Sequence, residues 1–340
     1  MDFIELYQQE PQKYWQPPKG NTLIKDIFDN PMRYAKDYVA TQKYDGEWAM
    51  VLVNENHEVY IHSRSRGVSG EFGNFTEKVP HLVELFKQLP KNTCLLGELC
   101  FEDETKTSKD VGSILRCLPP KAIARQKDNP LIFRAFDCLY YHNLDLTTMP
   151  YSERMGYVAR VIAAFSFDYT DYIRMVKFIP ITENFAETVT ELWGRGAEGV
   201  VLVKQNSLYA FGKRPARESI KIKKTTGELE LKVVDTVEPN KLYEGKDFNG
   251  WKYWDIDNET PVTKPYFYGW KNGIVVDNNG TEVSVASGLT DNDREWLATE
   301  EAQNYIKGGK LYAVVSAMEI DAASGSLRHP YLVRLRTDVE

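Results

Sequence analysis

The sequence lacks the features that would place it in a membrane or in an oxidising compartment. No apolar run among its 340 residues approaches the roughly 18 residues that a membrane-spanning helix needs. Residues 1–5 carry acidic side chains where a secretory signal has basic ones, and no apolar stretch follows them. Only four cysteines are present, and their spacings match no CxxC pattern of zinc or redox sites. We therefore expect a cytoplasmic protein with free buried thiols and no membrane partner.

An excess of positive charge is also missing, because the formal net charge is −7. The charge is nevertheless unevenly distributed. Residues 1–227 carry 30 Lys and Arg against 29 acids, whereas residues 228–340 carry 12 against 20. Within the first part, residues 204–224 hold seven basic side chains and one acidic side chain, Glu218. Such a segment can bind phosphate groups whatever the total charge, although a solvated basic loop would have the same composition.

Hydrophobic residues make up 42% of the chain and aromatic residues 12%, which is ample for a packed interior. Since 340 residues are more than one core usually serves, two domains are expected. In the first part, short strands alternate with amphipathic helices, which indicates an α+β fold of antiparallel sheets flanked by helices. Strands are predicted at residues 38–53, 58–63, 94–101, 131–141, 199–203 and 219–224. Helices are predicted at residues 75–89, 152–165 and 182–193.

Two local signals in this part predict more than the element type. Asp45-Gly46 is suited to the positive backbone angles of a tight turn and predicts a hairpin within residues 38–53. Ser152 and Thr182 are the expected N-caps of the last two helices.

Strands dominate from residue 229 onward. Asn278-Asn279-Gly280 predicts a hairpin turn, and one helix is predicted from Asp291 to about Tyr305 with Thr290 as its N-cap. Five strands with one helix in about 110 residues are typical of a small Greek-key barrel of the oligonucleotide-binding (OB) kind. The domain boundary is placed between residues 227 and 228.

The most informative stretch is Lys43-Tyr44-Asp45-Gly46. A lysine at the end of a strand, before a turn, projects into whatever cleft the edge of the sheet forms. To act as a nucleophile it has to be deprotonated, so that nearby positive charge or desolvation has to lower its pKa, and residues 204–224 could supply that charge. Taken alone, the same four residues also fit an ordinary lysine in a surface hairpin.

Five further motifs follow in order, within about 180 residues of the first. They are His62-Ser63-Arg64-Ser65-Arg66-Gly67, Leu96-Gly97-Glu98-Leu99, Phe133-Arg134-Ala135-Phe136-Asp137, Ala197-Glu198-Gly199-Val200-Val201 and Ser219-Ile220-Lys221-Ile222-Lys223-Lys224. This succession resembles the covalent-lysine nucleotidyltransferases, which include ATP-dependent DNA ligases, RNA ligases and messenger-RNA capping enzymes. Residues 325–336 extend the resemblance to the small two-domain DNA ligases of bacteriophages, so that it covers nearly the whole chain.

The resemblance implies a fold and an activity. Residues 1–227 would form a nucleotidyltransferase (adenylation) domain of ATP-grasp-like antiparallel sheets, and residues 228–340 an OB-fold β-barrel that binds DNA. Lys43 would attack the α-phosphorus of ATP, giving lysine–AMP and pyrophosphate. AMP would pass to the 5′-phosphate of a nick in double-stranded DNA, and the 3′-hydroxyl would then displace it. The protein is expected to act as a monomer with Mg²⁺, for which Mn²⁺ can substitute.

The resemblance also assigns the site residues. Besides Lys43, the catalytic residues are Lys221 and Lys223, which alternate on one strand and so point the same way, and Arg64. Each of these four is also expected to bind the nucleotide. The further nucleotide ligands are Thr41 at the adenine amino group, Phe136 stacked on adenine, Glu98 on the ribose hydroxyl, Glu198 through the metal, and Arg336 at the pyrophosphate. Glu198 and Glu98 are the expected metal ligands.

Two positions depart from the family pattern. Trp48 stands where the family often has an arginine, and Val339 where it usually has a lysine; Lys25, Arg33 or Arg66 are candidates to replace the missing arginine. Three rival functions remain open. An RNA ligase shares the first motifs, a capping enzyme would prefer GTP, and a nucleic-acid-binding module without activity would not need the lysines and glutamates that are present.

Overall fold

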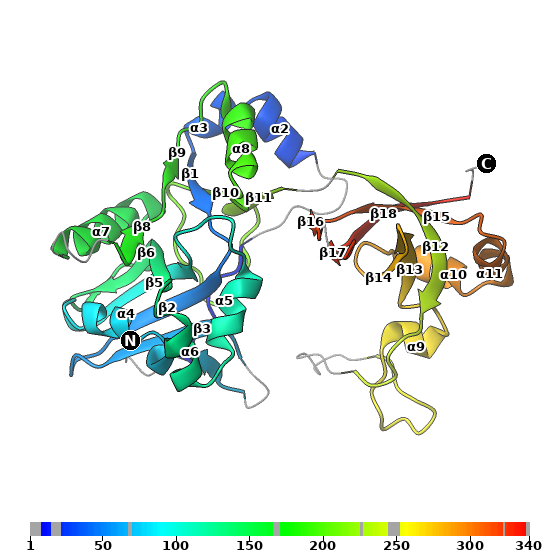
Figure 1. Cartoon of the computed structure of the whole chain (residues 1–340), viewed down its shortest axis with the longest axis horizontal. Helices are drawn as coiled ribbons and strands as arrows, with labels where there is room; N and C mark the ends of the chain where they lie inside the picture. Colours follow the sequence, from blue (N-terminus) through cyan, green and yellow to red (C-terminus); the bar gives the residue numbers. More distant parts are fainter. Residues whose placement is uncertain are drawn as a thin grey trace. The chain divides into compact units, whose positions relative to one another are not determined.

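The chain divides into two units, Met1–Lys223 and Lys224–Glu340. The predicted boundary lies a few residues after this division. The computed structural model in Figure 1 describes residues 8–14, 22–66, 70–165, 171–224, 227–243, 252–321 and 324–337. Among these residues, no helix has both the length and the apolar character needed to cross a membrane.

The larger sheet of the first unit has seven strands in the order β4-β3-β2-β5-β6-β7, with β8 paired to β6. The strands are β2 (Glu47–Val53), β3 (Val59–Arg66), β4 (Phe72–Asn74), β5 (Thr93–Cys100), β6 (Ile132–Tyr141), β7 (Leu144–Asp145) and β8 (Ile173–Met175). All pairs are antiparallel except β6 with β8. Alternation along β2 places Ala49 and Val51 in the core under the helices, while Trp48 and Met50 point to the opposite face.

The smaller sheet has the strand order β11-β10-β1-β9. Its strands are β1 (Tyr38–Lys43), β9 (Phe178–Ile179), β10 (Gly199–Lys204) and β11 (Ser219–Lys223). One face of this sheet is apolar and packs against α2 (Leu23–Asp29) and α8 (Phe185–Gly194), as Figure 1 also shows. The other face carries Thr41, Lys43 and Lys221, because side chains along β1 and β11 point alternately to the two faces of the sheet.

Further helices complete the first unit. They are α3 (Met32–Ala35), the 3₁₀ helix η1 (Thr76–Lys78), α4 (Pro80–Phe86), α5 (Ser108–Leu115), α6 (Pro119–Arg125) and α7 (Tyr151–Ala164). The predicted helix over residues 75–89 is therefore η1 followed by α4. The predicted caps are wrong, since Pro150 precedes α7 and Asn184 precedes α8.

The predicted hairpin around Asp45-Gly46 is wrong, although both of its strands exist. β1 pairs with β9 and β10, whereas β2 pairs with β3 and β5 in the other sheet. Neither Asp45 nor Gly46 has a positive φ. A Cβ atom on Gly46 would lie 2.1 Å from the carbonyl oxygen of Leu99, so this glycine permits the close crossing of the chain from one sheet to the other.

The second unit is built on a five-stranded antiparallel sheet in the order β14-β13-β12-β15-β18. The strands are β12 (Leu229–Val237), β13 (Gly273–Asn278), β14 (Thr281–Val285), β15 (Tyr312–Ser316) and β18 (Tyr331–Arg336), with a small pair of β16 (Glu319–Ile320) and β17 (Leu327–Arg328). The predicted hairpin is confirmed, since β13 pairs with β14 and both Asn279 and Gly280 have positive φ.

Three helices accompany this sheet: α9 (Lys264–Tyr268), α10 (Asp291–Leu297) and α11 (Glu300–Lys307). Thr290 caps α10 in a reciprocal pair with Asp293, as predicted. The single predicted helix is broken after Leu297, because Thr299 caps a new helix by accepting a hydrogen bond from the amide of Ala302.

The smaller sheet depends on glycine at position 199, and a substitution tests this. Gly199 has φ +150°, and an added Cβ would lie 2.0 Å from the carbonyl oxygen of Ile222. We expect Gly199→Ala to lower the free energy of unfolding by about 3 kcal/mol in urea denaturation. Gly156→Ala is the matched control, because this exposed glycine of α7 has no neighbour within 4 Å of an added Cβ. It should be neutral or stabilising by up to about 1 kcal/mol. Equal stability of the two variants would contradict the packing argument.

Candidate functional site

A cleft lies between the polar face of the smaller sheet and the face of the larger sheet that carries Trp48. Its empty volume, open mouth included, is about 750 Å³. Four of the expected nucleotide ligands line it: Thr41, Lys43, Glu98 and Phe136. Further lining residues that the sequence did not suggest are Gln12, Tyr14, Tyr151, Arg154 and Tyr209.

The register of three strands brings two lysines to one carboxylate. Lys43 of β1 and Lys223 of β11 lie on either side of Gly199 of β10, directly opposite it in the two pairings. Glu198 precedes this glycine. Lys223 Nζ lies 2.6 Å from Glu198 Oε1, and Lys43 Nζ donates a hydrogen bond to Glu198 Oε2. Only 6% of the Glu198 side chain is exposed, so that its charge is balanced mainly by these two lysines.

This arrangement overturns the expected direction of the Lys43 pKa. The nearby basic segment was expected to lower that pKa. Burial does act in that direction, but the carboxylates of Glu198 and Glu98 outweigh it and raise the pKa of Lys43 above its ordinary value. The ammonium form is therefore favoured in this arrangement, and Lys43 has to give up a proton before it can act as a nucleophile.

Two neighbouring groups have pKa values shifted toward neutrality. Burial raises the pKa of Glu98 to about 7, with Glu198 adding to the effect and Lys43 opposing it. Burial together with the positive charges of Lys43 and Lys223 lowers the pKa of Lys221 to about 8. Shifts of this kind, caused by burial and specific charges in a cleft, are typical of functional sites.

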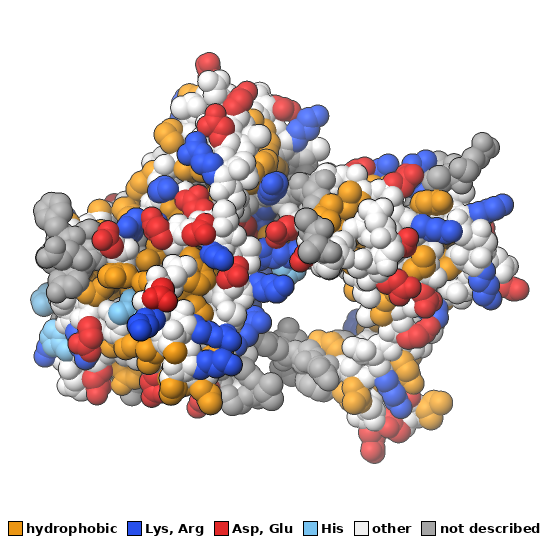
Figure 2. All heavy atoms as spheres, in the orientation of Figure 1, with side chains coloured by type: hydrophobic (Ala, Val, Ile, Leu, Met, Phe, Trp, Pro, Cys, Tyr) orange, Lys and Arg blue, Asp and Glu red, His pale blue; other side chains and the backbone are white. Residues whose placement is uncertain are grey.

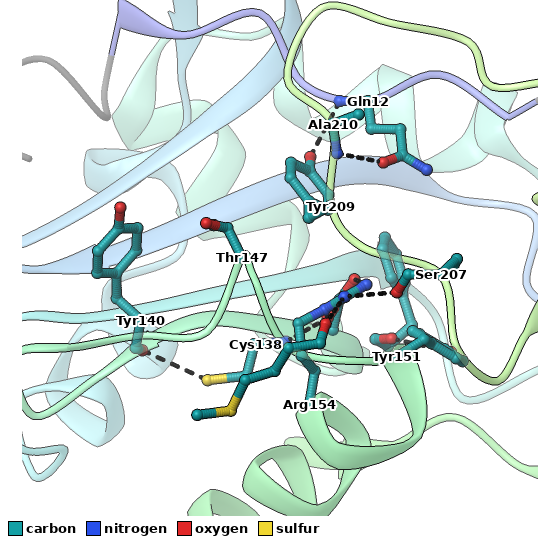
Figure 3. A network of polar contacts seen from close by, with 12 residues as sticks. Gln12, Cys138, Tyr140, Thr147, Tyr151, Arg154, Ser207, Tyr209 and Ala210 are labelled. Carbon is teal, nitrogen blue, oxygen red and sulfur yellow. Dashed lines mark hydrogen bonds and ion pairs between the residues drawn. The ribbon is translucent and has the colours of Figure 1, made fainter.

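A buried ion pair holds the strand that carries Phe136. Arg154 of α7, which is 2% exposed, donates hydrogen bonds to both carboxylate oxygens of Asp137, at 2.8 and 3.0 Å. Its remaining nitrogen donates to the carbonyl oxygens of Met149 and Ser207, and Figure 3 shows this network. Asp137 thus orders the structure beside Phe136, and both residues line the cleft.

The two arginines of the second motif contact a segment near the N-terminus. Arg64 Nη2 donates to the carbonyl oxygen of Gln12 at 3.0 Å, and Arg66 forms an ion pair with Glu10 at 3.1 Å. Arg66 is therefore not simply solvated. β3 extends beyond the predicted strand of residues 58–63 and carries both arginines. No periodicity or motif in residues 8–14 indicated this contact.

Several candidate residues of the first unit are not brought to the cleft. Lys204, from the basic segment of residues 204–224, lies on the helix-facing side of β10 and pairs with Glu218 at 3.1 Å. Arg33 pairs with Asp26 on the surface, and Lys25 is exposed on α2. Burial raises the pKa of Glu47, which precedes Trp48 in the sequence. The positive charge of Arg116 on α5 opposes this rise. Arg336 lies on β18 of the second unit, where it pairs with Glu230, and Val339 lies outside the described residues.

The residues present fit a divalent cation only with help from a phosphate ligand. Within the described part of the chain, no group of three or more His, Cys, Asp or Glu side chains could hold a metal ion. However, the negative charges of Glu98 and Glu198 both raise the pKa of Lys43. Mg²⁺ is commonly bound by one or two carboxylates together with substrate phosphates and water, so that these two glutamates could hold it once a polyphosphate is bound.

Comparison with known proteins gives consistent results. The family described as "ATP dependent DNA ligase domain" matches residues 23–223, more than half of the chain. A DNA ligase of Methanococcus aeolicus is 26% identical over 318 residues, which cover 87% of this chain and 50% of that protein. A DNA ligase of vaccinia virus is 26% identical over 207 residues, covering 57% of this chain and 34% of that protein. The chain thus spans about half the length of the first relative and about a third of the second.

One solved structure, from a study of Lig E DNA ligases, aligns along nearly the full length of both chains. Its TM-score is 0.60 at 15% identity, and the alignment covers 95% of this chain and 99% of the other. At this identity the likeness concerns the fold. It confirms the predicted α+β architecture, a nucleotidyltransferase fold of antiparallel sheets and helices followed by an OB-fold β-barrel.

The pKa of Glu98 predicts how stability depends on pH. This pKa is higher in the folded state than in the unfolded chain, so the folded protein binds the proton of Glu98 more tightly. The contribution of Glu98 to stability therefore falls as the pH rises from about 4.5 to 7, and it stays low above pH 7. Glu98→Gln removes this loss. Relative to wild type, we expect the variant to be more stable at pH 8 than at pH 5 by a difference on the order of 2 kcal/mol, measured by urea denaturation.

The matched control is Glu84→Gln on α4, whose side chain is 70% exposed and pairs only with Lys87 in the structure. Its stability relative to wild type should not change with pH beyond a few tenths of a kcal/mol. A pH-independent effect of Glu98→Gln would show that Glu98 is not protonated on folding.

Proposed function

The chain belongs to the ATP-dependent DNA ligase family, and from this premise we propose that it joins nicked double-stranded DNA through a covalent lysine–AMP intermediate. The nucleotide is ATP, and the strands joined end in a 5′-phosphate and a 3′-hydroxyl. The observation that carries this proposal is the position of Lys43 at the edge of the cleft, with Glu98, Glu198, Lys221 and Lys223 around it.

In the first step Lys43 Nζ attacks the α-phosphorus of ATP. A P–N bond forms, the bond to the pyrophosphate leaving group breaks, and one proton leaves the lysine. Glu198 Oε2 is the acceptor within hydrogen-bond reach of that proton. Lys221 and Lys223 lie on the same face of β11 and offset the negative charge that spreads over the phosphate oxygens. Phe136 and Thr41 hold the adenine, and Arg64 with Glu98 holds the ribose.

In the later steps AMP moves from Lys43 to the 5′-phosphate of the nick, and the 3′-hydroxyl then displaces it to form the phosphodiester bond. Glu198 and Glu98, together with phosphates, would hold Mg²⁺, which would supply positive charge at the reacting phosphate. In the second unit, Arg336 acts on the pyrophosphate and the OB-fold barrel binds DNA. We propose that the residues before 228 form the adenylation domain, that those from 228 onward form the DNA-binding domain, and that one chain acts alone.

A basic surface on the first unit supports DNA as the substrate. Residues 105–127, which include α5 and α6, carry exposed Lys and Arg and no exposed Asp or Glu. The basic residues are Lys106, Lys109, Arg116, Lys121, Arg125 and Lys127. The acid in this stretch, Asp110, is half-buried and bonded to Thr107. Figure 2 shows Lys and Arg side chains gathered over this part of the unit. Such a surface attracts a phosphate backbone even though the net charge of the chain is negative.

The proposal predicts a covalent adduct that depends on Lys43. After incubation with ATP and Mg²⁺, intact-mass measurement should show wild-type protein heavier by one AMP, and the Lys43→Ala variant should show no adduct. Lys91→Ala, which removes an exposed lysine in the turn before β5, is the control and should form the adduct like wild type.

The isolated adduct should then lose its AMP and seal a 5′-phosphorylated nick in duplex DNA without further ATP. An adduct that persists in Lys43→Ala would refute the assignment of the nucleophile. Transfer to a nick in RNA but not to one in DNA would instead identify an RNA ligase.

A further inference from the structure

The segment of residues 8–14 is fixed against the cleft by contacts along its whole length. Arg66 Nη2 donates to the carbonyl oxygen of Gln8 at 2.7 Å, in addition to the ion pair of Arg66 with Glu10. The amide of Gly212 donates to the carbonyl oxygen of Glu10 at 2.6 Å, and the amide of Lys13 donates to the carbonyl oxygen of Lys213 at 2.9 Å.

Gln12 makes two further hydrogen bonds. Its backbone amide donates to the hydroxyl of Tyr209 at 3.0 Å, and its side-chain oxygen accepts from the amide of Ala210 at 2.7 Å. Figure 3 shows both contacts. With its carbonyl oxygen also bound by Arg64, Gln12 fixes the position of the chain just before Tyr14.

The side chain of Tyr14 is thereby placed among the proposed nucleotide ligands. Its ring centre lies 6.4 Å from that of Phe136, 5.2 Å from Lys221 Nζ and 5.9 Å from the guanidinium carbon of Arg64. Burial, aided by the negative charge of Glu98, raises the pKa of the Tyr14 hydroxyl well above its ordinary value, and both residues line the same cleft.

These four neighbours are the groups assigned to different parts of one nucleotide. Phe136 is assigned to the base, Arg64 and Glu98 to the ribose, and Lys221 to the phosphates. With its ring centre 5.2–6.4 Å from Lys221, Arg64 and Phe136, Tyr14 covers the faces that these three groups turn toward it. A nucleotide that contacted the same faces would therefore compete with the ring for this space.

We propose that residues 8–14 are a built-in competitor for the nucleotide, and that Tyr14 sets the affinity of the site for ATP by having to leave before ATP can bind. This inference rests on the proposed function, because the four ligands are those assigned there. The apparent dissociation constant is then the intrinsic one divided by the fraction of molecules in which Tyr14 is displaced. Displacement also releases Arg64 from the carbonyl oxygen of Gln12, so that the arginine becomes available to the ribose.

The test measures binding without chemistry. The probe is α,β-methylene ATP, which lacks the bond that Lys43 would break, titrated into the full chain by calorimetry. We expect Tyr14→Ala to lower the dissociation constant on the order of tenfold. Tyr14→Phe keeps the ring and should bind like wild type, as should Tyr60→Ala, which removes a tyrosine that is 39% exposed on β3.

A second variant weakens the segment without changing the ring. Glu10→Ala removes the ion pair with Arg66 and should lower the dissociation constant by roughly twofold. It serves as the test if Tyr14→Ala does not fold, as judged by its circular dichroism melting curve.

Weaker binding in Tyr14→Ala would show that Tyr14 is a wall of the nucleotide site, and unchanged binding would show that it does not compete; either result overturns the inference. If the analogue binds as expected but ATP leaves no adduct on wild type, the proposed chemistry fails while the competition stands. If the analogue binds to none of the proteins, the nucleotide site and its competitor are both refuted.

Discussion

The site depends on one buried carboxylate that two lysines share. Glu198 stands where β10 begins, and the pairing of β1 and β11 on either side of Gly199 fixes Lys43 and Lys223 at its two oxygens. Because neighbouring strands lie about 5 Å apart, this register brings both lysines within reach of the residue that precedes Gly199. The absence of a side chain at position 199 allows β11 to approach at this point. The close approach of the strands at Gly199 and the pairing of Glu198 with the two lysines therefore favour the same strand register.

This shared carboxylate has a chemical consequence. The ammonium form of Lys43, the proposed nucleophile, is favoured, and this form cannot attack. Nearby, the pKa values of Lys221 and Glu98 are shifted toward neutrality. The negative charge of a bound polyphosphate would interact most strongly with the lysines and would compete with Glu198 for them. Tyr14 in turn lies beside Lys221 and Arg64. In the nucleotide-free site these groups are therefore already paired with one another, and they would exchange partners when the nucleotide binds.

Much of this site could be predicted from the sequence because the motifs lie on strands. Alternation along β1, β10 and β11 decides which side chains share a face, and the positions of Thr41, Lys43 and Lys221 follow from it. The partners of those strands could not be predicted in the same way. Asp45-Gly46 has the composition of a hairpin turn, yet it joins two sheets, because the pairing of β1 with β10 is decided by residues more than 150 positions away.

The remaining differences have the same origin. The direction of the Lys43 pKa was predicted wrongly from the basic segment, because Glu198 and Glu98 come close to Lys43 only in the folded chain. Residues 8–14 have no periodicity that marks them, and their place in the cleft depends on contacts with residues 209–213 and with Arg64 and Arg66, which are distant in the sequence. Helices α5 and α6 are too short, at eight and seven residues, to give a clear helical pattern.

The most direct test of the central claim is a measurement of the Lys43 pKa in the nucleotide-free protein. Titration of its ¹⁵Nζ resonance by NMR, assigned with Lys43→Arg, would follow this group alone. If Glu198 holds the lysine in its charged form, the pKa in wild type lies above the ordinary value of 10.5 and falls by at least about one unit in Glu198→Gln. A wild-type pKa below 10.5, or the same pKa in both proteins, would contradict the account.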